Sequence, residues 1–483
     1  MELDRNSTIP LHRQVENYIK KKISSGEWAV GTKLPSQRSL ADSLAVNRST
    51  VITALEELAA LGLIEGRHGG GTKVINNTWG LVARRKPADW GNYVEAGRYK
   101  SNLPMIRKIN EAEFYPGMIR MGTGELSPAL LPNERFAGLL KNAPSGLLSL
   151  GYQEPKGDIR LREEISRHLM AIGIQTELSS ILVVSGALQA LQLISIGLLD
   201  HGSTLILEKP SYLYSIHVFQ SLGMRFVGLP IDSDGMRPEK LSDYKKQYQG
   251  SIVYTIPSFH NPTGVVMTEK RRRELLLECG RERLPIIEDD VYRDLWLDAP
   301  PPCTLKGMDQ SGNVLYIGSL SKILSPGLRI GWVVGPAPVI DRLADIKMQS
   351  DYGASSLSQW AAEESLRTGL YEEHACFVRE QLKARRDDLA ELLDQYFSDI
   401  AAWRIPTGGF YVWLKLVPKI DPHLLFEEAL RHGILLNPGV MYDRGARQYL
   451  RLSYAYAASE EMKKAIRILR KLVMELAGGE KIT

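Results

Sequence analysis

Apolar residues recur at helical spacing near the start of the chain. Four of them fall on one face of a predicted helix: Leu11, Val15, Ile19 and Ile23. Gly26 is expected to end this helix. A second short helix should begin at Ser36, a good N-cap residue, and a third near Asn47. The stretch LIEGRHGGGTKVI then has the pattern of two short strands joined by a glycine turn.

The rest of the chain has a different pattern of apolar and polar residues. From about residue 76 to 116 the sequence is charged, basic and rich in turn residues, which indicates a linker with room for a helix near its end. Helical stretches such as ALQALQLISIGLL then alternate with apolar strands such as STLILEKP and NVLYIGS. This alternation predicts a mostly parallel sheet with helices on both faces. From about residue 351, helices followed by FYVWLKL and YLRLSYA predict a smaller α+β lobe.

Composition narrows the class of protein. The chain has 483 residues, of which 44% are hydrophobic and 24% charged, as in globular proteins of two to four domains. The formal net charge of +4 is compatible with nucleic acid binding without requiring it. Three widely spaced cysteines favour neither a metal site nor a disulfide framework. The start lacks a signal-peptide core, and no run of about 18 apolar residues predicts a membrane span, so we expect a cytoplasmic protein.

The segment PSQRSLADSLAVNRSTVITALEEL has the length and the cap and turn residues of a helix-turn-helix, with its turn at residues 45–47. Short polar groups at the start of the second helix can donate to phosphate, and Arg48 can reach guanine in a major groove. Arg38 is suited to backbone or base contacts, and the RHGGG tip can enter a minor groove. The same residues are equally compatible with an ordinary polar surface and a tight hairpin.

Over about seventy residues this region resembles a GntR-type winged helix. The blocks LPSQRSLA and VNRSTV and the closing Gly-Thr-x-Val carry the resemblance. It implies contacts with double-stranded DNA, with Arg48 as the main base reader. The implied DNA-binding residues are Lys33, Ser36, Arg38, Asn47, Arg48, Ser49, Thr50, His68 and Gly69.

A second set of residues suits a pyridoxal phosphate site, which needs a lysine, a carboxylate, a phosphate cradle and ring contacts. In SLSKILSPGLRIGW, Lys322 can supply the amine, while Ser319, Ser321 and Arg329 can donate to a phosphate. Asp289 in IIEDDVY follows a buried strand, where a ring nitrogen could compensate its charge. Without a cofactor, this lysine would be solvated and this carboxylate a helix cap or a surface group.

Four further stretches allow either a site or a structural role. Asn261 in FHNPTG is a turn former or a donor to a phenolic oxygen, a task that Tyr292 can share. Tyr212 in EKPSY is a core aromatic or a ring that stacks on the cofactor. The segment SGALQ opens a helix after a strand, where free amides bind phosphate. Arg451 in YLRLSYA is an ion-paired surface arginine or a clamp for a substrate carboxylate.

The order of these signals resembles the fold-type I aminotransferases of class I, over roughly residues 117–478. The resemblance implies an internal aldimine on Lys322, Asp289 at the ring nitrogen and Tyr212 stacked on the ring. It implies the phenolic oxygen on Asn261 and Tyr292. The implied phosphate and effector-carboxylate residues are Ala187, Leu188, Ser319, Ser321 and Arg329, Tyr152 from LGYQEPKGDIRLR toward the partner subunit, and Arg451 for the carboxylate.

A GntR-like winged helix followed by an aminotransferase-like domain is the layout of the MocR regulators. The expected division is a winged helix at 1–75, a linker at 76–116 and a pyridoxal phosphate domain at 117–483. Within that domain we expect a large domain at about 150–345 and a small lobe from about 117–149 and 346–483.

The MocR resemblance implies a cytoplasmic, homodimeric transcription regulator that senses pyridoxal phosphate, or its aldimine with an amino acid or amine, and changes its binding to paired operator half-sites. One departure is Tyr214, where some members carry an arginine two residues after the stacking tyrosine. The effector preference of those members is therefore not expected of this chain. An active aminotransferase with a DNA-binding appendage, in which Lys322 also moves protons, remains an alternative, as does a cofactor-free dimerisation scaffold.

Overall fold

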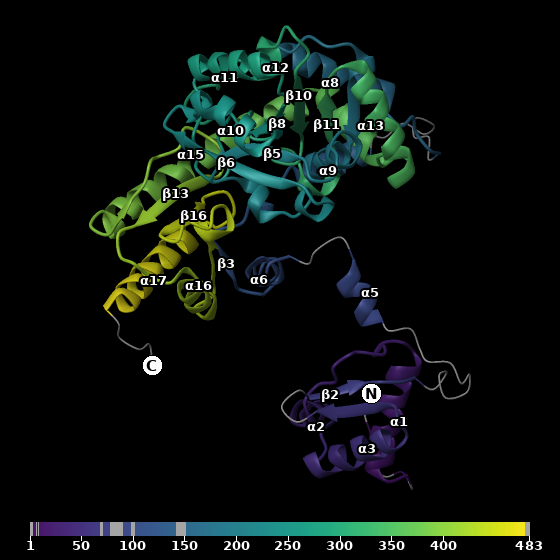
Figure 1. Cartoon of the computed structure of the whole chain (residues 1–483). Coiled ribbons are helices and arrows are strands. Elements are labelled where there is room, and N and C mark those ends of the chain that lie inside the picture. The colour runs from purple at the N-terminus through teal and green to yellow at the C-terminus, as the bar shows by residue number, and fades with distance from the viewer. Residues whose placement is uncertain are drawn as a thin grey trace. The chain divides into compact units, whose positions relative to one another are not determined.

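The chain folds into two compact units, Met1–Arg98 and Tyr99–Thr483, each of which is described by itself (Figure 1). The computed structural model describes residues 3–5, 7, 9–67, 71–77, 90–97, 102–141 and 151–478. No described helix is long and apolar enough to cross a membrane.

The first unit is a helix-turn-helix followed by a hairpin. Its elements are α1 (Leu11–Ser24), α2 (Gln37–Leu44), α3 (Arg48–Ala60), β1 (Ile64–Arg67), β2 (Gly71–Val74) and α5 (Trp90–Ala96). The hydroxyl of Ser36 caps α2 by accepting a hydrogen bond from the Ser39 N–H at 3.1 Å. Ala45, at φ 50°, provides the left-handed turn that redirects the chain into α3. The predicted short helices and their turn are therefore confirmed.

The core of this unit comes from the apolar faces that the sequence pattern predicts. Val15 and Ile19 of α1 are fully buried against Val51 and Leu58 of α3 in one cluster. Strands β1 and β2 pair antiparallel with Ile64 opposite Val74. The tip of the predicted wing, with His68 and Gly69, lies outside the described residues.

The second unit is built on an eight-stranded mixed sheet in the order β4-β11-β10-β9-β8-β5-β6-β7. Neighbouring strands from β10 to β6 run parallel, whereas β11 is antiparallel to both β10 and β4, and β7 is antiparallel to β6. The strands are β4 (Ile181–Val184), β5 (Thr204–Lys209), β6 (Arg225–Asp232), β7 (Gly235–Met236), β8 (Gly250–Thr255), β9 (Ile286–Asp289), β10 (Val314–Ser319) and β11 (Gly331–Val334).

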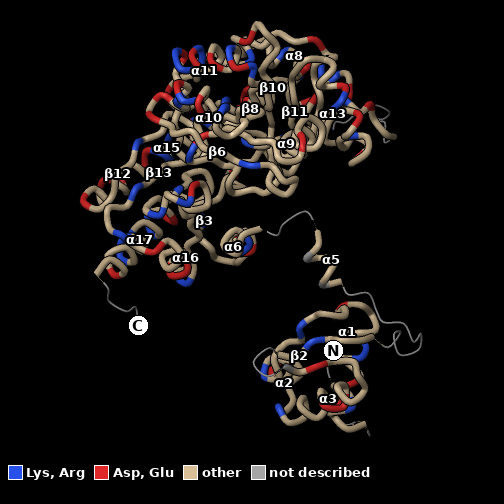
Figure 2. The backbone as a smooth tube through the Cα atoms, viewed as in Figure 1, with Lys and Arg blue, Asp and Glu red and all other residues tan. Residues whose placement is uncertain are grey.

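Helices cover both faces of this sheet. Alternate strand residues point to opposite faces, and Ile206, Val253 and Ile286 join one buried cluster with residues of α10 (Leu241–Tyr248), α11 (Glu269–Glu282) and α12 (Leu305–Met308). Their neighbours along the strands join the main core, which includes α8 (Ile159–Ala171), α9 (Ala187–Gly197) and α13 (Ala337–Ser350). Figure 2 shows that α11 is rich in charged residues, in keeping with its sequence EKRRRELLLECGRE. The predicted fold class is confirmed.

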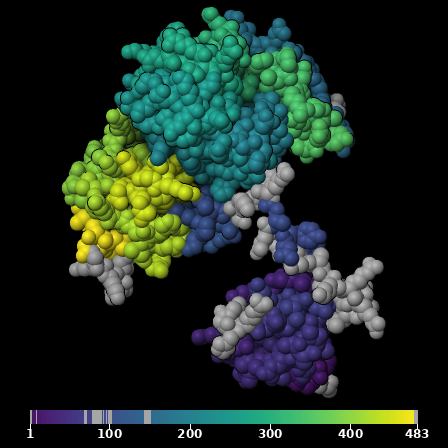
Figure 3. All heavy atoms as spheres, in the orientation of Figure 1, coloured from purple at the N-terminus to yellow at the C-terminus, as the bar shows by residue number. Residues whose placement is uncertain are grey.

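The C-terminal part forms a smaller lobe that packs against the large sheet domain (Figure 3). Its sheet has the order β12-β13-β16-β15, and β14 pairs parallel with β3. The strands are β3 (Ile119–Arg120), β12 (Ala401–Ala402), β13 (Tyr411–Leu416), β14 (Ile434–Leu435), β15 (Asn437–Pro438) and β16 (Tyr449–Ser453). Apart from α6 (Pro104–Ala112), the other described α-helices of the unit are α7 (Asn133–Lys141), α14 (Ser356–Arg367), α15 (Leu370–Phe397), α16 (Pro422–Arg431) and α17 (Ser459–Gly478).

Helix α6 (Pro104–Ala112) occupies the end of the stretch expected to be a linker. Ile106 and Ile109 of α6 are buried in a cluster with Phe426 of α16 and Tyr442. The last part of the expected linker is therefore a packed helix of the small lobe, because its apolar residues recur at helical spacing and find a partner face there.

Candidate functional site

A cavity of about 670 Å³ lies between the large sheet and the small lobe. Parallel strands place their carboxyl ends at one edge of a sheet, where ligands usually bind. Tyr212 follows β5, Asn261 follows β8, Asp289 ends β9 and Ser319 ends β10, so residues far apart in the sequence meet at this edge. The cavity brings together the expected residues Lys322, Asp289, Tyr212, Asn261, Tyr292, Ala187, Leu188, Ser319, Ser321, Arg329 and Arg451.

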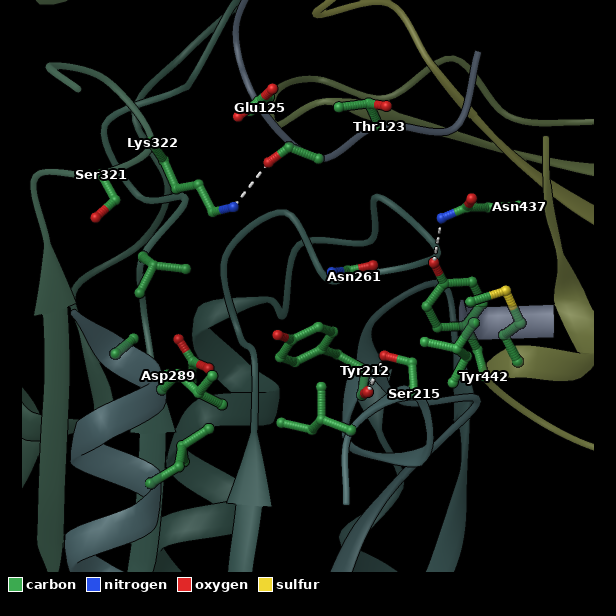
Figure 4. A pocket seen from close by; sticks show the side chains of 18 of the residues that line it. Thr123, Glu125, Tyr212, Ser215, Asn261, Asp289, Ser321, Lys322, Asn437 and Tyr442 are labelled. Atoms are coloured by element: carbon green, nitrogen blue, oxygen red, sulfur yellow. Dashed lines mark hydrogen bonds between the residues drawn. The ribbon is translucent and has the colours of Figure 1, made fainter. Parts of the chain in front are cut away.

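Lys322 points into this cavity (Figure 4). Its Nζ donates a hydrogen bond to the carbonyl of Gly124 at 2.8 Å and lies 5.5 Å from the centre of the Tyr292 ring. The amine thus has a neutral acceptor and an aromatic neighbour, and no described carboxylate forms a salt bridge with it. A lysine held in this way is accessible to a carbonyl compound that enters the cavity.

Asp289 is the last residue of β9, rather than the residue after the strand, and only 3% of it is exposed. Its Oδ2 accepts a hydrogen bond from the Tyr254 hydroxyl at 2.7 Å, whereas Oδ1 has no hydrogen-bond partner among the described residues. Burial raises the pKa of this carboxyl to about 6, partly opposed by the Tyr254 hydroxyl. A buried carboxylate oxygen without a donor, on a cavity wall, suits a protonated ring nitrogen.

A chain of hydrogen bonds connects Asn261 to the small lobe. Its Nδ2 donates to the Tyr292 hydroxyl at 3.3 Å, and its Oδ1 accepts from Arg451 Nη1 at 2.9 Å. Arg451 lies in β16, and its guanidinium packs over the Tyr411 ring at 4.0 Å. The position of Arg451 within a strand is confirmed, but it is buried in the cavity wall rather than on the surface. Its Nε has no hydrogen-bond partner among the described residues.

The start of α9 and the loop before β11 form a polar corner of the cavity. Gly186, at φ 84°, directly precedes α9, so the first amides of the helix are free to bind an anion. Arg329 Nη2 donates to the Ser185 carbonyl at 3.0 Å, which places its guanidinium beside these amides. Ser319 Oγ accepts from the Ser321 N–H at 3.1 Å, and the buried Ser321 Oγ has no partner among the described residues.

The two expected tyrosines have different surroundings. Tyr212 stands in the cavity wall near Asp289 (Figure 4), and burial raises the pKa of its hydroxyl. Tyr152 does not line the cavity; it is 87% exposed, and its ring lies 5.2 Å from that of Tyr352. Its exposure is compatible with a role at a second copy of the chain.

The sequence analysis missed several residues of this site. Tyr254, Tyr411 and Asn437 stand in strands, where they appear as ordinary core positions. Glu113 and Glu125 belong to no motif, and only the folded chain brings them to the cavity.

Those of the expected DNA-binding residues that the structure describes lie on or beside α2 and α3. Arg38, Asn47, Arg48 and Ser49 are exposed, and Thr50 is half-buried at the start of α3. Lys33 is exposed, and its backbone forms an isolated antiparallel β-bridge with that of Lys73 in the hairpin. The Ser36 hydroxyl caps α2.

Gln37 was not predicted as part of this surface. Its Oε1 accepts from Arg48 Nε at 3.3 Å and Nη2 at 3.0 Å, which orients the arginine. The signal was available in the sequence, because Gln37 directly follows the Ser36 cap.

Two family models match the chain. Residues 11–74 match the bacterial regulatory proteins of the gntR family, and residues 117–469 match the aminotransferases of class I and II. A gntR-type domain fused to an aminotransferase domain defines a class of DNA-binding transcriptional regulators.

The chain belongs to this class, the MocR-type regulators. It is 53% identical over 474 residues to the HTH-type transcriptional regulator YisV of Bacillus subtilis, covering 97% of this chain and 98% of that protein. It is 35% identical over 437 residues to the HTH-type transcriptional regulator NorG of Staphylococcus aureus, covering 90% and 98%. The expected family and the expected role in transcription are confirmed.

Solved structures resemble the larger unit. The kynurenine aminotransferase of Pyrococcus horikoshii, solved with PMP, matches with a TM-score of 0.75 and 29% identity over 80% of this chain and 98% of that one. The α-aminoadipate aminotransferase LysN of Thermus thermophilus matches with a TM-score of 0.72 and 28% identity over 81% and 100%. The aminotransferase domain implies pyridoxal phosphate as cofactor, and the unpartnered Asp289 and Ser321 oxygens beside Lys322 fit that group.

Proposed function

We propose that this regulator changes its binding to an operator when pyridoxal phosphate, alone or together with an amino acid or amine, occupies the cavity. The observation that best supports this role is the buried, unpartnered Oδ1 of Asp289 on the wall that Lys322 also lines. An uncompensated acidic group of this kind is costly in a chain that only dimerises a DNA reader.

Each residue of the cavity receives a defined task in this proposal. When bound, pyridoxal phosphate supplies an aldehyde that condenses with amines and a ring that withdraws electrons. Lys322 attaches the cofactor, Asp289 holds the proton of the ring nitrogen, and Tyr212 packs against the ring. Asn261 and Tyr292 hydrogen-bond its phenolic oxygen.

The phosphate and the effector occupy opposite parts of the cavity in this proposal. Phosphate is held by the amides of Ala187 and Leu188, by Ser319, Ser321 and Arg329, and by Tyr152 reaching the cavity of a second copy in a homodimer. Arg451 holds the carboxylate of an amino acid effector.

DNA binding follows from the gntR-type domain, and its details belong to the proposal. We assign base reading chiefly to Arg48, with phosphate contacts from Lys33, Ser36, Arg38, Asn47, Ser49 and Thr50. His68 and Gly69 are assigned to the minor groove. A homodimer carries two such readers and therefore selects paired half-sites on the DNA. A regulator of this kind works in the cytoplasm.

An effector acts only by binding one arrangement of the dimer more tightly than another. Operator affinity of the purified protein should therefore change when pyridoxal phosphate and then individual amino compounds are added. An operator affinity that no combination of them alters, in protein that has bound the cofactor, would contradict sensing.

A second candidate function is an active aminotransferase with a DNA-binding domain. The complete set of cavity residues, from Lys322 to Arg451, favours it. Conversion of an amino acid to its keto acid distinguishes the two functions. A regulator releases little keto acid, whereas an enzyme turns over many times per active site.

A further inference from the structure

Two carboxylates of the cavity have no task in the proposed cofactor site. The charged residues that line the cavity are Glu113, Glu125, Asp289, Lys322, Arg329 and Arg451. The proposed function uses the last four for the cofactor and the effector carboxylate. Glu113 and Glu125 remain, and they give the effector side of the cavity a negative charge.

The surroundings of these carboxylates offset little of their charge. Glu113 accepts a hydrogen bond from the Thr123 hydroxyl at 2.9 Å, which is a neutral donor. Glu125 Oε1 lies 3.5 Å from Nη1 of Arg120, with which it forms a salt bridge. The Arg120 guanidinium also packs over the Tyr456 ring, 4.4 Å from its centre. Burial and the proximity of Glu113 raise the pKa of Glu125, although Arg120 and Lys322 oppose the shift. Among the described residues, the two carboxylates therefore share one salt-bridge partner, Arg120.

A third acceptor on the same wall also needs a donor. Asn437 is 6% exposed; its Nδ2 donates to the Tyr442 hydroxyl at 3.1 Å, and its Oδ1 has no partner among the described residues. Glu125, Thr123 and Asn437 lie on one side of the cavity, with Asp289 and Tyr212 on the other (Figure 4). A buried acceptor without a donor is costly, so a ligand that supplies donors here gains affinity.

We propose that the effector is a basic amino acid, with a second positively charged group besides the amine that meets the cofactor. This inference rests on the proposed function: Arg451 holds the carboxylate, and Glu113 and Glu125 hold the second cationic group. A neutral side chain leaves the two carboxylates without compensation, and an acidic side chain is repelled by them.

The position of Glu113 links this recognition to the start of the unit. Glu113 directly follows α6 as its C-cap residue. Helix α6 lies near the end of the segment, residues 76–116, that follows the DNA-binding domain in the sequence.

The test uses the full-length protein loaded with pyridoxal phosphate. Ornithine and lysine are compared with norleucine and with 2-aminoadipate, and both the visible absorbance and the operator affinity are measured. The wild type should respond to a basic amino acid at a concentration at least about tenfold lower than to norleucine, as expected for a charge-assisted hydrogen bond. Equal responses to basic, neutral and acidic amino acids would overturn the inference.

Isosteric variants separate recognition from folding. Glu113→Gln and Glu125→Gln should each reduce the preference for ornithine over norleucine about tenfold. Glu111→Gln is the matched control, because Glu111 is an exposed residue of α6 that does not line the cavity. If the Gln variants instead weaken cofactor binding and lower the response to every amino acid by the same factor, the carboxylates support the binding of the cofactor to Lys322 and do not recognise the effector. If the cofactor binds but no amino compound changes either signal, the proposed sensing function itself fails.

Discussion

Replacing Asp289 with asparagine should weaken cofactor binding and, at the same time, stabilise the cofactor-free protein. Asp289 is 3% exposed, and only one of its oxygens is hydrogen-bonded, to Tyr254. Asparagine has nearly the same shape and keeps an acceptor for the Tyr254 hydroxyl. The substitution therefore removes the charge with little other change to the packing.

The size of the effect follows from the pKa. Burial raises the pKa of Asp289 from 3.8 to about 6. At about 1.4 kcal/mol for each pKa unit, the ionised carboxylate costs the folded protein about 3 kcal/mol. Because the folded protein binds the proton more tightly than the unfolded chain, this cost is absent below about pH 4, grows until about pH 6 and is constant above it.

The assay is thermal unfolding of the cofactor-free protein at pH 5 and pH 8. Asp289→Asn should raise the Tm of the larger unit at pH 8 and raise it less at pH 5. Pyridoxal phosphate should reverse the order at pH 8: it stabilises the wild type by compensating the carboxylate, and it stabilises the variant much less. Its Kd for the variant should rise at least about tenfold, since a charge-assisted hydrogen bond is lost.

Two results would refute this reasoning. A cofactor-free variant with the same Tm as the wild type at pH 8 would mean that the carboxylate is not strained by burial. A variant that binds pyridoxal phosphate as tightly as the wild type would mean that Asp289 does not meet the ring nitrogen.

Other substitutions test separate parts of the account. Lys322→Ala should abolish the response to effectors while leaving DNA binding measurable; loss of both in a folded protein would contradict separable roles. Arg48→Ala should weaken specific operator binding by about 1–3 kcal/mol, measured by competition with unrelated DNA, and an unchanged sequence preference would move base reading elsewhere. Gly186→Ala should lower cofactor affinity at least about tenfold, because a methyl group there collides with the Arg329 guanidinium. Gly202→Ala is its control: that glycine also has a positive φ, of 86°, but no neighbour within 4 Å, so it should lose stability and not affinity.

The sequence was sufficient for the elements and for much of the site. Apolar periodicity located α1 and α3, and the Ser36 cap marked the start of α2. Lys322, Asp289 and Asn261 could be predicted because each stands in a short motif next to a strand end. Parallel strands then bring such motifs to one edge of the sheet, whatever their separation along the chain.

The rest depended on contacts that leave no local pattern. Asn437 reaches the cavity because β15 pairs with β16. Glu125 reaches it because the segment after β3 forms part of the cavity wall. The sequence analysis allowed a helix near the end of the linker, but it did not show that α6 packs, because the partner face of Ile106 and Ile109 forms only in the folded chain. Tertiary packing decides such cases, and local propensity does not.

The most direct test of the central claim is chemical mapping of the cofactor attachment. The purified protein is incubated with pyridoxal phosphate and reduced with borohydride, which fixes any imine as a stable amine, and its peptides are then analysed by mass spectrometry. The account predicts one phosphopyridoxyl group per chain, on Lys322, and none on Lys322→Ala. A protein that carries no label at this lysine, or that is labelled only on exposed lysines, would contradict it.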